Sequence, residues 1–413
     1  MPTAAAQRRI ARLASLTAVH RAFHWLHLHQ PQLRQWQLEF VRIPAPTFAE
    51  APRAAWFLDR FRQLGLTNPH LDSAGNALAE LTPASACDPS TPCLLLSAHL
   101  DTVFPAGTPC DPVESPDSPR ILAPGICDNA AGLSALLAIA AALRFAHLDP
   151  PIPILFASNV GEEGLGDLNG MRHLFTQGSY QGRIAAAIVL EGSGTGPVVT
   201  RALGSRRFRV TITGPGGHSW SDAGTPNPIL LLSHALVALG QLPLPDSPRT
   251  TLNIGQISGG TSINSIPESA TALVDLRSTD PYQLLVTEAD LLDQLHRTVA
   301  TFARRNTTFA PPTLHIERIG DRPAAALPDD APLLRTLRAV DRHLTLRTEP
   351  RIGSTDANIP LSLGIPAIAI GCGGTGGGIH TLQEWYDPSG RETALRRILL
   401  TLLDTVQLLT PTV

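Results

Sequence analysis

An imidazole and a carboxylate lie two residues apart at the end of an apolar stretch. His99 and Asp101 follow the run Leu94-Leu95-Leu96-Ser97-Ala98, whose length and composition are those of a buried strand. Side chains alternate across a strand, so His99 and Asp101 point to the same side. A histidine that binds a metal through one ring nitrogen needs a partner for the other, and a carboxylate is a common one. The pair therefore predicts a metal-binding His99 that is oriented by Asp101.

Further carboxylates and a second imidazole occur where other apolar runs end or loops begin: Asp128, Glu162, Glu163, Glu191 and His380. Nitrogen and oxygen ligands without thiolate suit zinc, cobalt or manganese in an open catalytic site. Asp128 precedes an alanine-rich helix, where its two oxygens could bridge two metals. One of the adjacent pair Glu162 and Glu163 could bind metal while the other takes a proton from a metal-activated water. Each residue alone is more often a surface charge or a buried structural residue. Their shared placement, where open α/β sheets carry their sites, favours a single two-metal site.

The bulk composition excludes several classes of protein. The chain has 413 residues, more than one core usually fills, so two domains are expected. Its net charge of -3 is not the basic balance that is typical of proteins binding nucleic acid or an anionic membrane surface. It contains no lysine, which excludes a pyridoxal-phosphate Schiff base and a P-loop. The five cysteines form no C-x-x-C pair, and an odd number cannot all pair internally, so we expect reduced thiols. Neither a signal peptide nor a membrane-spanning run appears, so we expect a cytoplasmic protein.

Strands and helices alternate over both ends of the chain. Strands are expected at 76–82, 93–98, 152–158, 185–190 and 367–370, and helices within 4–65 and at 129–144, 171–176, 333–343 and 393–409. This alternation predicts an α/β fold with a mostly parallel sheet and helices on both faces. The candidate ligands then belong to one catalytic domain, formed by residues 1–205 and 320–413.

The pattern changes between the two halves of that domain. Residues 206–319 show the order strand, helix, strand, strand, helix, strand, with strands at 208–213, 250–258, 270–277 and 313–319 and helices at 228–239 and 281–305. This βαββαβ order is that of a ferredoxin-like unit. We therefore expect a second compact domain inserted into the first.

The chain resembles the two-metal exopeptidase and deacylase family that includes carboxypeptidase G, peptidase T, succinyl-diaminopimelate desuccinylase, acetylornithine deacetylase and aminoacylase. The resemblance covers nearly the whole chain and depends on six segments in a fixed order: Ser97-Ala98-His99-Leu100-Asp101-Thr102-Val103, Asp128, Gly161-Glu162-Glu163-Gly164, Leu190-Glu191-Gly192, Gly216-Gly217-His218-Ser219 and His380. It implies a zinc-exopeptidase-like catalytic domain and an inserted lid or dimerisation domain. Many members carry a lysine after the aspartate that matches Asp128, whereas this chain has Asn129.

The resemblance also implies a role for each matching residue. Asp128 would bridge two divalent metal ions, zinc before cobalt or manganese. The remaining ligands would be His99 and Glu191 at one metal, and Glu163 and His380 at the other. Glu162 would be the general base, and Asp101 would orient His99. In relatives, a glutamate at the position of Glu191 favours carboxypeptidases and N-acyl-amino-acid deacylases, and an aspartate favours aminopeptidases.

Four residues outside the ligand set match positions near the substrate of relatives. His218 would reach the site of a partner subunit and stabilise the oxyanion, which implies a homodimer; the alternative is a surface loop residue. Asn264 and Arg277 would hold the substrate carboxylate, although Arg277 could equally belong to a structural ion pair. Ser354, in Gly353-Ser354-Thr355-Asp356, matches a substrate-side loop.

The sequence as a whole predicts a hydrolase that uses a metal-activated water, with Glu162 as general base, to cleave an amide or peptide bond. Its substrate would be a small peptide or an N-acyl amino acid. Two alternatives remain, an aminopeptidase acting on short peptides and a catalytically silent metal-binding homologue. The presence of Glu162 argues against the second, because a protein that only binds metal needs no base beside its ligands.

Overall fold

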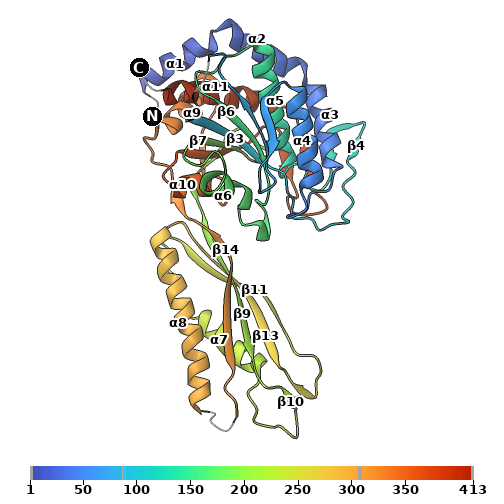
Figure 1. Ribbon diagram of the computed structural model, residues 1–413, viewed down its shortest axis with the longest axis vertical. Coiled ribbons are helices and arrows are strands. Elements are labelled where there is room, and N and C mark those ends of the chain that lie inside the picture. The colour runs from blue at the N-terminus through green and yellow to red at the C-terminus, as the bar shows by residue number, and fades with distance from the viewer. Residues whose placement is uncertain (1–2, 86–87, 89, 306–308, 411–413) are drawn as a thin grey trace. The chain divides into compact units, whose positions relative to one another are not determined.

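The computed structural model describes residues 3–85, 88, 90–305 and 309–410. The chain divides into two compact units (Figure 1): unit 1 comprises Met1–Arg201 and Ala326–Val413, and unit 2 comprises Ala202–Ala325. The division lies a few residues outside the 206–319 segment expected from the sequence. None of the described helices is both long and apolar enough to cross a membrane.

Four parallel strands form the centre of the large sheet in unit 1. They are β3 (Cys93–His99), β6 (Ile154–Asn159), β7 (Ile184–Leu190) and β17 (Ala367–Ile370), in the spatial order β6-β3-β7-β17. Every residue of β3 and β6 is buried, as expected for strands covered on both faces. The register sets His99 opposite Asn159 and Ser97 opposite Val189. The expected largely parallel α/β sheet is confirmed.

Further strands extend this sheet on both sides. On the β6 side lie the antiparallel strands β2 (Ala77–Leu81) and β1 (Thr67–Leu71). On the β17 side lies the antiparallel strand β8 (Pro197–Ala202), which is flanked by β15 (Ala325–Ala326) and β16 (Glu349–Gly353). These flanking strands give the sheet its mixed character. The site strands are therefore in the interior of the sheet and not at its edges.

The helices of unit 1 are α1 (Ala4–Ala14), α2 (Thr17–Leu28), α3 (Gln30–Val41), α4 (Ala51–Gln63), α5 (Ala130–Ala146), α6 (Asn169–Thr176), α9 (Pro332–His343), α10 (Asn358–Ser362) and α11 (Arg391–Leu409). The helix α5 is apolar almost all round because it packs on β3 and is itself covered by α2 and α3. Asn129 caps its first turn by accepting the Gly132 N–H at 3.1 Å. This buried helix fixes the position of the loop that precedes it.

A second, smaller sheet in unit 1 joins segments far apart in the sequence. Its order is β18 (Thr375–Gly377), β19 (Trp385–Asp387), β5 (Ser118–Leu122) and β4 (Val113–Ser115). The sequence did not predict this sheet, because strands this short, among prolines and glycines, carry no clear period. It pairs the segment before Asp128 with the segment that contains His380.

Unit 2 is an antiparallel sheet covered by two helices. The strands β9 (Gly204–Thr213), β11 (Thr250–Gly259), β13 (Ser269–Ser278) and β14 (Thr313–Arg322) lie in the order β11-β13-β9-β14, and the helices are α7 (Pro228–Leu239) and α8 (Pro281–Arg305). The chain order is the expected βαββαβ, with an additional two-stranded ribbon of β10 (Gly217–His218) and β12 (Ser265–Ile266).

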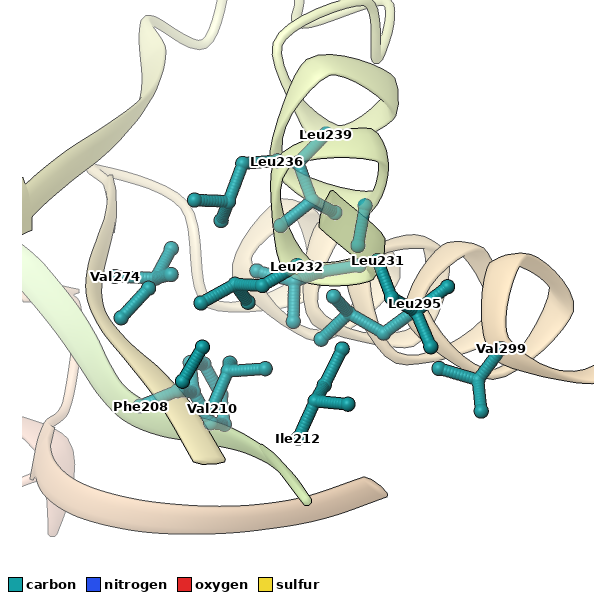
Figure 2. Packing of buried hydrophobic residues seen from close by; sticks show 14 residues of the cluster. Phe208, Val210, Ile212, Leu231, Leu232, Leu236, Leu239, Val274, Leu295 and Val299 are labelled. Atoms are coloured by element: carbon teal, nitrogen blue, oxygen red, sulfur yellow. The ribbon is translucent and has the colours of Figure 1, made fainter. Parts of the chain in front are cut away.

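The core of unit 2 lies between this sheet and its helices. Burial alternates along β13, so one face of the sheet points inward. Figure 2 shows leucines of α7 and side chains of α8 meeting residues of β9 and β13; the labelled residues are Phe208, Val210, Ile212, Leu231, Leu232, Leu236, Leu239, Val274, Leu295 and Val299. Unit 2 therefore has a hydrophobic core of its own, as a domain requires.

Candidate metal centre

The five side chains predicted as metal ligands converge around the carboxylate of Asp128. One oxygen of Asp128 lies 3.1 Å from His99 Nε2, and that nitrogen is 3.6 Å from a carboxylate oxygen of Glu191. The other oxygen of Asp128 lies 3.0 Å from His380 Nε2, which is 3.2 Å from Glu163 Oε1. The structure thus arranges the four remaining side chains as two pairs, one at each oxygen of Asp128.

Strand ends and loops bring these residues to one edge of the large sheet. His99 is the last residue of β3, Glu191 follows β7 directly, and Glu163 lies in the loop after β6. Asp128 precedes α5, and His380 lies between β18 and β19. The carboxyl ends of parallel strands meet at one edge, which is where open α/β sheets carry their sites.

The donor set fits divalent metal ions. Ligand atoms of His99, Asp128 and Glu163 all lie within 4.8 Å of one another. Oε2 of Glu191 is buried and has no hydrogen-bond partner within the described residues, an uncommon state for a carboxylate oxygen that is not bound to a cation. Two imidazoles and three carboxylates without thiolate suit zinc, cobalt or manganese. These side chains fit two metals that share Asp128.

The electrostatics of the cluster reflect an excess of buried carboxylates. Burial alone would lower the pKa of His99, but the surrounding carboxylates, Glu191 foremost, outweigh it and raise that pKa well above its usual value. Burial raises the pKa of Glu163, and the nearby Asp128 carboxylate adds to the rise. Burial also acts to raise the pKa of Asp128, yet the two imidazoles bonded to it hold that pKa well below its usual range. Bound cations would relieve this excess of negative charge.

The metal-free protein should bind metal more tightly as the pH rises from about 6.5 to about 9. The hydrogen bond to Asp128 raises the pKa of His380 to about 9, against about 6.5 in an unfolded chain. This proton stabilises the metal-free fold fully below about pH 6.5, and the contribution is lost as the pH rises through about 9. Metal binding requires the neutral imidazole. We expect the increase in Tm on adding Zn²⁺, measured by calorimetry, to grow over this interval. A constant or shrinking increase would contradict the prediction.

Asp101 contacts both His99 and the loop that follows β6. Its Oδ1 lies 3.4 Å from His99 Nδ1, and its backbone oxygen lies 3.0 Å from the same nitrogen. The two carboxylate oxygens also accept the backbone N–H groups of Glu162 at 2.9 Å and Glu163 at 2.8 Å. The geometry suits the orienting role expected for Asp101. The second set of contacts, through which Asp101 holds the Glu162–Glu163 loop, could not be predicted from the sequence.

Glu384 and Asn129 support the site and were missed by the sequence analysis. The buried carboxylate of Glu384 accepts the backbone N–H groups of Gly125, Cys127 and Asp128 at 2.8–2.9 Å. Asn129 donates to the Leu190 carbonyl at 2.9 Å and accepts the Gly192 N–H at 3.1 Å, which ties the Asp128 loop to both sides of Glu191. Glu384 stands alone in a polar loop, so no spacing pointed to it. Asn129 was noted only as a departure from the family pattern.

The remaining predicted residues lie in different places. Glu162 is buried in unit 1 directly beside Glu163, and Ser354 lies in unit 1 in the turn after β16. In unit 2, His218 lies on β10 opposite Ser265 of β12, and Asn264 directly precedes β12, where its carbonyl accepts the Ser219 N–H at 3.0 Å. Arg277 lies on β13, and its Nε donates to Asp275 at 2.6 Å. Arg277 therefore forms a structural ion pair, which was the alternative to a substrate-binding role in the sequence-based prediction.

Comparisons with known proteins place these motifs in one family. The model of the peptidase family M20/M25/M40 matches residues 95–406. A probable carboxypeptidase of Aspergillus clavatus is 30% identical over 309 residues, which are 68% of this chain and 66% of that protein. The matches to two further curated relatives, probable carboxypeptidases of Arthroderma species, span 53% of each. The matched part of the chain therefore spans between about half and two thirds of these relatives.

Solved structures share the fold. A tripeptidase of Staphylococcus aureus superposes with a TM-score of 0.71 at 22% identity, covering 91% of this chain and 98% of its own. A Bacillus subtilis protein described as a dinuclear metal-binding peptidase superposes with a TM-score of 0.66 at 13% identity, covering 91% and 98%. At these identities the likeness establishes the two-domain architecture.

Proposed function

The chain belongs to the peptidase family M20/M25/M40, and from this premise we propose that it is a metal-dependent hydrolase that cleaves an amide or peptide bond. Its substrate would be a small peptide or an N-acyl amino acid with a free carboxylate. One observation carries the proposal: the two oxygens of Asp128 each face a histidine, and each histidine is paired with a further carboxylate.

We assign the ligands by this pairing. His99 and Glu191 would hold one metal together with Asp128, and Glu163 and His380 would hold the other, also with Asp128; zinc is the proposed metal, with cobalt or manganese as alternatives. When bound, such a pair of ions polarises a carbonyl and lowers the pKa of a water molecule to about 7. The protein supplies the ligand geometry, the buried surroundings and the proton acceptor.

Glu162 is the proposed general base. It follows Gly161 and precedes the ligand Glu163, and its backbone N–H is held by Asp101. Its carboxylate would accept a proton from the attacking water and pass it to the leaving nitrogen. General base catalysis of this kind contributes about 10²–10⁴-fold in rate. Adjacent glutamates thus take different tasks, one binding metal and the other moving a proton.

His218 is proposed to stabilise the oxyanion that forms during the attack. Its Nδ1 lies 3.2 Å from the Trp220 N–H and 3.4 Å from the Ser221 N–H, so that nitrogen is an acceptor. In the neutral ring the proton is then on Nε2, which can donate to an oxyanion. Asn264, whose carbonyl accepts the N–H of Ser219 beside His218, is proposed to bind the substrate, together with Arg277 and Ser354.

Chelation and a substrate panel test this function. We expect hydrolysis to disappear on removal of metal and to return with Zn²⁺, Co²⁺ or Mn²⁺. The glutamate at position 191 favours the carboxypeptidase or deacylase type, so N-acyl amino acids should be cleaved, and dipeptides with a free amino group less well. Cleavage only of substrates with a free amino terminus would favour the aminopeptidase instead. No cleavage of any substrate by metal-loaded protein would contradict the hydrolase itself.

We further propose that two copies of the chain pair through unit 2. β11 is the outermost strand of its sheet and, among the described residues, pairs only with β13. The neighbouring helix α7 exposes Leu230 (60%) and Val237 (64%), two turns apart on one side. Light scattering should give the mass of a dimer for the wild type and of a monomer for Leu230→Glu combined with Val237→Glu. Leu285→Glu on α8, where the leucine is 54% exposed, should remain dimeric. A monomeric wild type would overturn the proposal.

The proposal also includes the cellular compartment of the protein. We infer a cytoplasmic location from the cysteine pattern, since an odd number of cysteines cannot all form internal disulfides and cytosolic proteins keep their thiols reduced. Cys93, Cys110, Cys127 and Cys372 are free thiols, and Cys87 lies outside the described residues.

A further inference from the structure

Three successive backbone N–H groups in the loop after β6 point to carboxylate oxygens. The N–H groups of Glu162 and Glu163 donate to the two oxygens of Asp101, at 2.9 Å and 2.8 Å. The preceding N–H, that of Gly161, donates to Oε1 of Glu50 at 3.1 Å. Two carboxylates from different parts of the chain therefore hold the whole turn that presents Glu162.

Glu50 belongs to a segment that is fastened to the site at several points. It is buried and lies directly before α4, where its carbonyl accepts the Ala54 N–H at 2.9 Å. Thr47, three residues earlier, donates its hydroxyl to Asp101 at 3.0 Å. Arg53, three residues later, donates to the Leu100 carbonyl at 2.8 Å, between His99 and Asp101. This segment precedes residue 95, where the match to the family model begins.

Burial of the Glu50 carboxylate costs free energy, and hydrogen bonds from the backbone at Phe48, Glu50 and Gly161 offset that cost. Burial, and to a lesser extent the nearby Asp101 carboxylate, raise the pKa of Glu50. An apolar side chain here would avoid that cost but would leave the Gly161 N–H without its acceptor in a buried place. The loop also needs an external support, because Gly161 and Gly164 both have positive φ (67° and 51°) and flank the glutamate pair.

We propose that Glu50 is a positioning residue, which fixes the Gly161 end of this loop and thereby holds the Glu162 carboxylate in place for proton transfer. This inference rests on the proposed function of Glu162 as general base. A misplacement of a reacting group by about 1 Å can cost about 10²-fold in rate. Asp101 fixes the loop from the β3 side, and Glu50 fixes it from the α4 side.

Two substitutions at Glu50 and one control test the proposal. Glu50→Ala removes the acceptor, and we expect kcat to fall about 10–100-fold, with KM and metal content within twofold of the wild type. Glu50→Gln keeps an acceptor oxygen and should retain at least about a third of wild-type kcat. The control, Glu80→Ala, removes another buried glutamate of unit 1, which accepts the Tyr180 hydroxyl at 2.6 Å and lies on β2 opposite Leu155, away from the site end of β6. Its kcat should stay near that of the wild type.

Hydrogen–deuterium exchange of the metal-free proteins gives a readout that does not need activity. The amides of residues 161–163 should exchange at least tenfold faster in Glu50→Ala than in wild type, Glu50→Gln or Glu80→Ala. Unchanged exchange or unchanged kcat in Glu50→Ala would overturn the proposal. So would an equal loss of kcat in Glu50→Gln or Glu80→Ala. If the wild type cleaved no substrate, the proposed function would fail, while the exchange data would still decide whether Glu50 holds the loop.

Discussion

Replacing Glu162 by glutamine is expected to lower kcat about 10³-fold while the protein keeps its full complement of metal. The amide is nearly the same size as the carboxylate but cannot accept a proton, so the loss isolates the base. A factor of 10³ corresponds to about 4 kcal/mol in the activation free energy, within the range that general base catalysis supplies. The backbone N–H that holds this residue to Asp101 is unaffected by the substitution. Single-turnover kinetics with metal analysis by mass spectrometry provide the measurement.

The adjacent residue is the matched control for Glu162. Glu163→Gln alters a side chain of the same type in the same loop, and Glu163 faces His380 at 3.2 Å. It should lose metal from one site, and excess Zn²⁺ should restore part of its activity. Excess metal should not restore Glu162→Gln. Wild-type rates for Glu162→Gln would remove the proposed mechanism, and an equal loss of metal in both variants would mean that the two roles are not divided as proposed.

The sequence predicted that the five proposed ligands belong to one cluster, because four of them (His99, Asp128, Glu163 and Glu191) follow a strand or precede a helix with a strong pattern. His99 ends one apolar run and Glu191 directly follows another, and the length and composition of each run indicate a buried strand. In a parallel sheet the carboxyl ends of such strands lie at the same edge. The order of elements in unit 2 was likewise visible, because β13 alternates, α7 is a largely apolar run of helical length and α8 has a clear apolar face.

The supporting residues could not be predicted in the same way. Glu50 and Glu384 act by accepting backbone N–H groups from loops more than a hundred residues away in sequence. Such a bond depends on where a loop runs in space, and a single glutamate before a helix or in a polar loop looks like any surface charge. The small sheet that positions His380 has strands of three to five residues, too short for a recognisable period.

Removing the carboxylate of Asp128 is expected to abolish binding of both metals and to lower kcat/KM at least about 10⁴-fold, which is about 5.5 kcal/mol. The reason is geometric: one oxygen of Asp128 faces His99 and the other faces His380. In the proposed arrangement, Asp128→Ala would therefore remove a ligand from both sites at once, whereas each of the other four residues would belong to one pair. Metal content after dialysis, with catalytic assay of the same samples, measures the effect.

His380→Ala separates a bridging role from a simple ligand role. His380 faces one of the two Asp128 oxygens and also faces Glu163. Its loss should therefore leave the other pair, His99 and Glu191, able to hold one metal ion. We expect about one metal per chain in His380→Ala and none in Asp128→Ala. The Asp128 loop should keep its shape in both variants, because Glu384 holds its backbone N–H groups and Asn129 ties it to the end of β7. If Asp128→Ala retained one metal per chain, Asp128 would serve one site alone, and its proposed role as a bridge between two metals would be wrong.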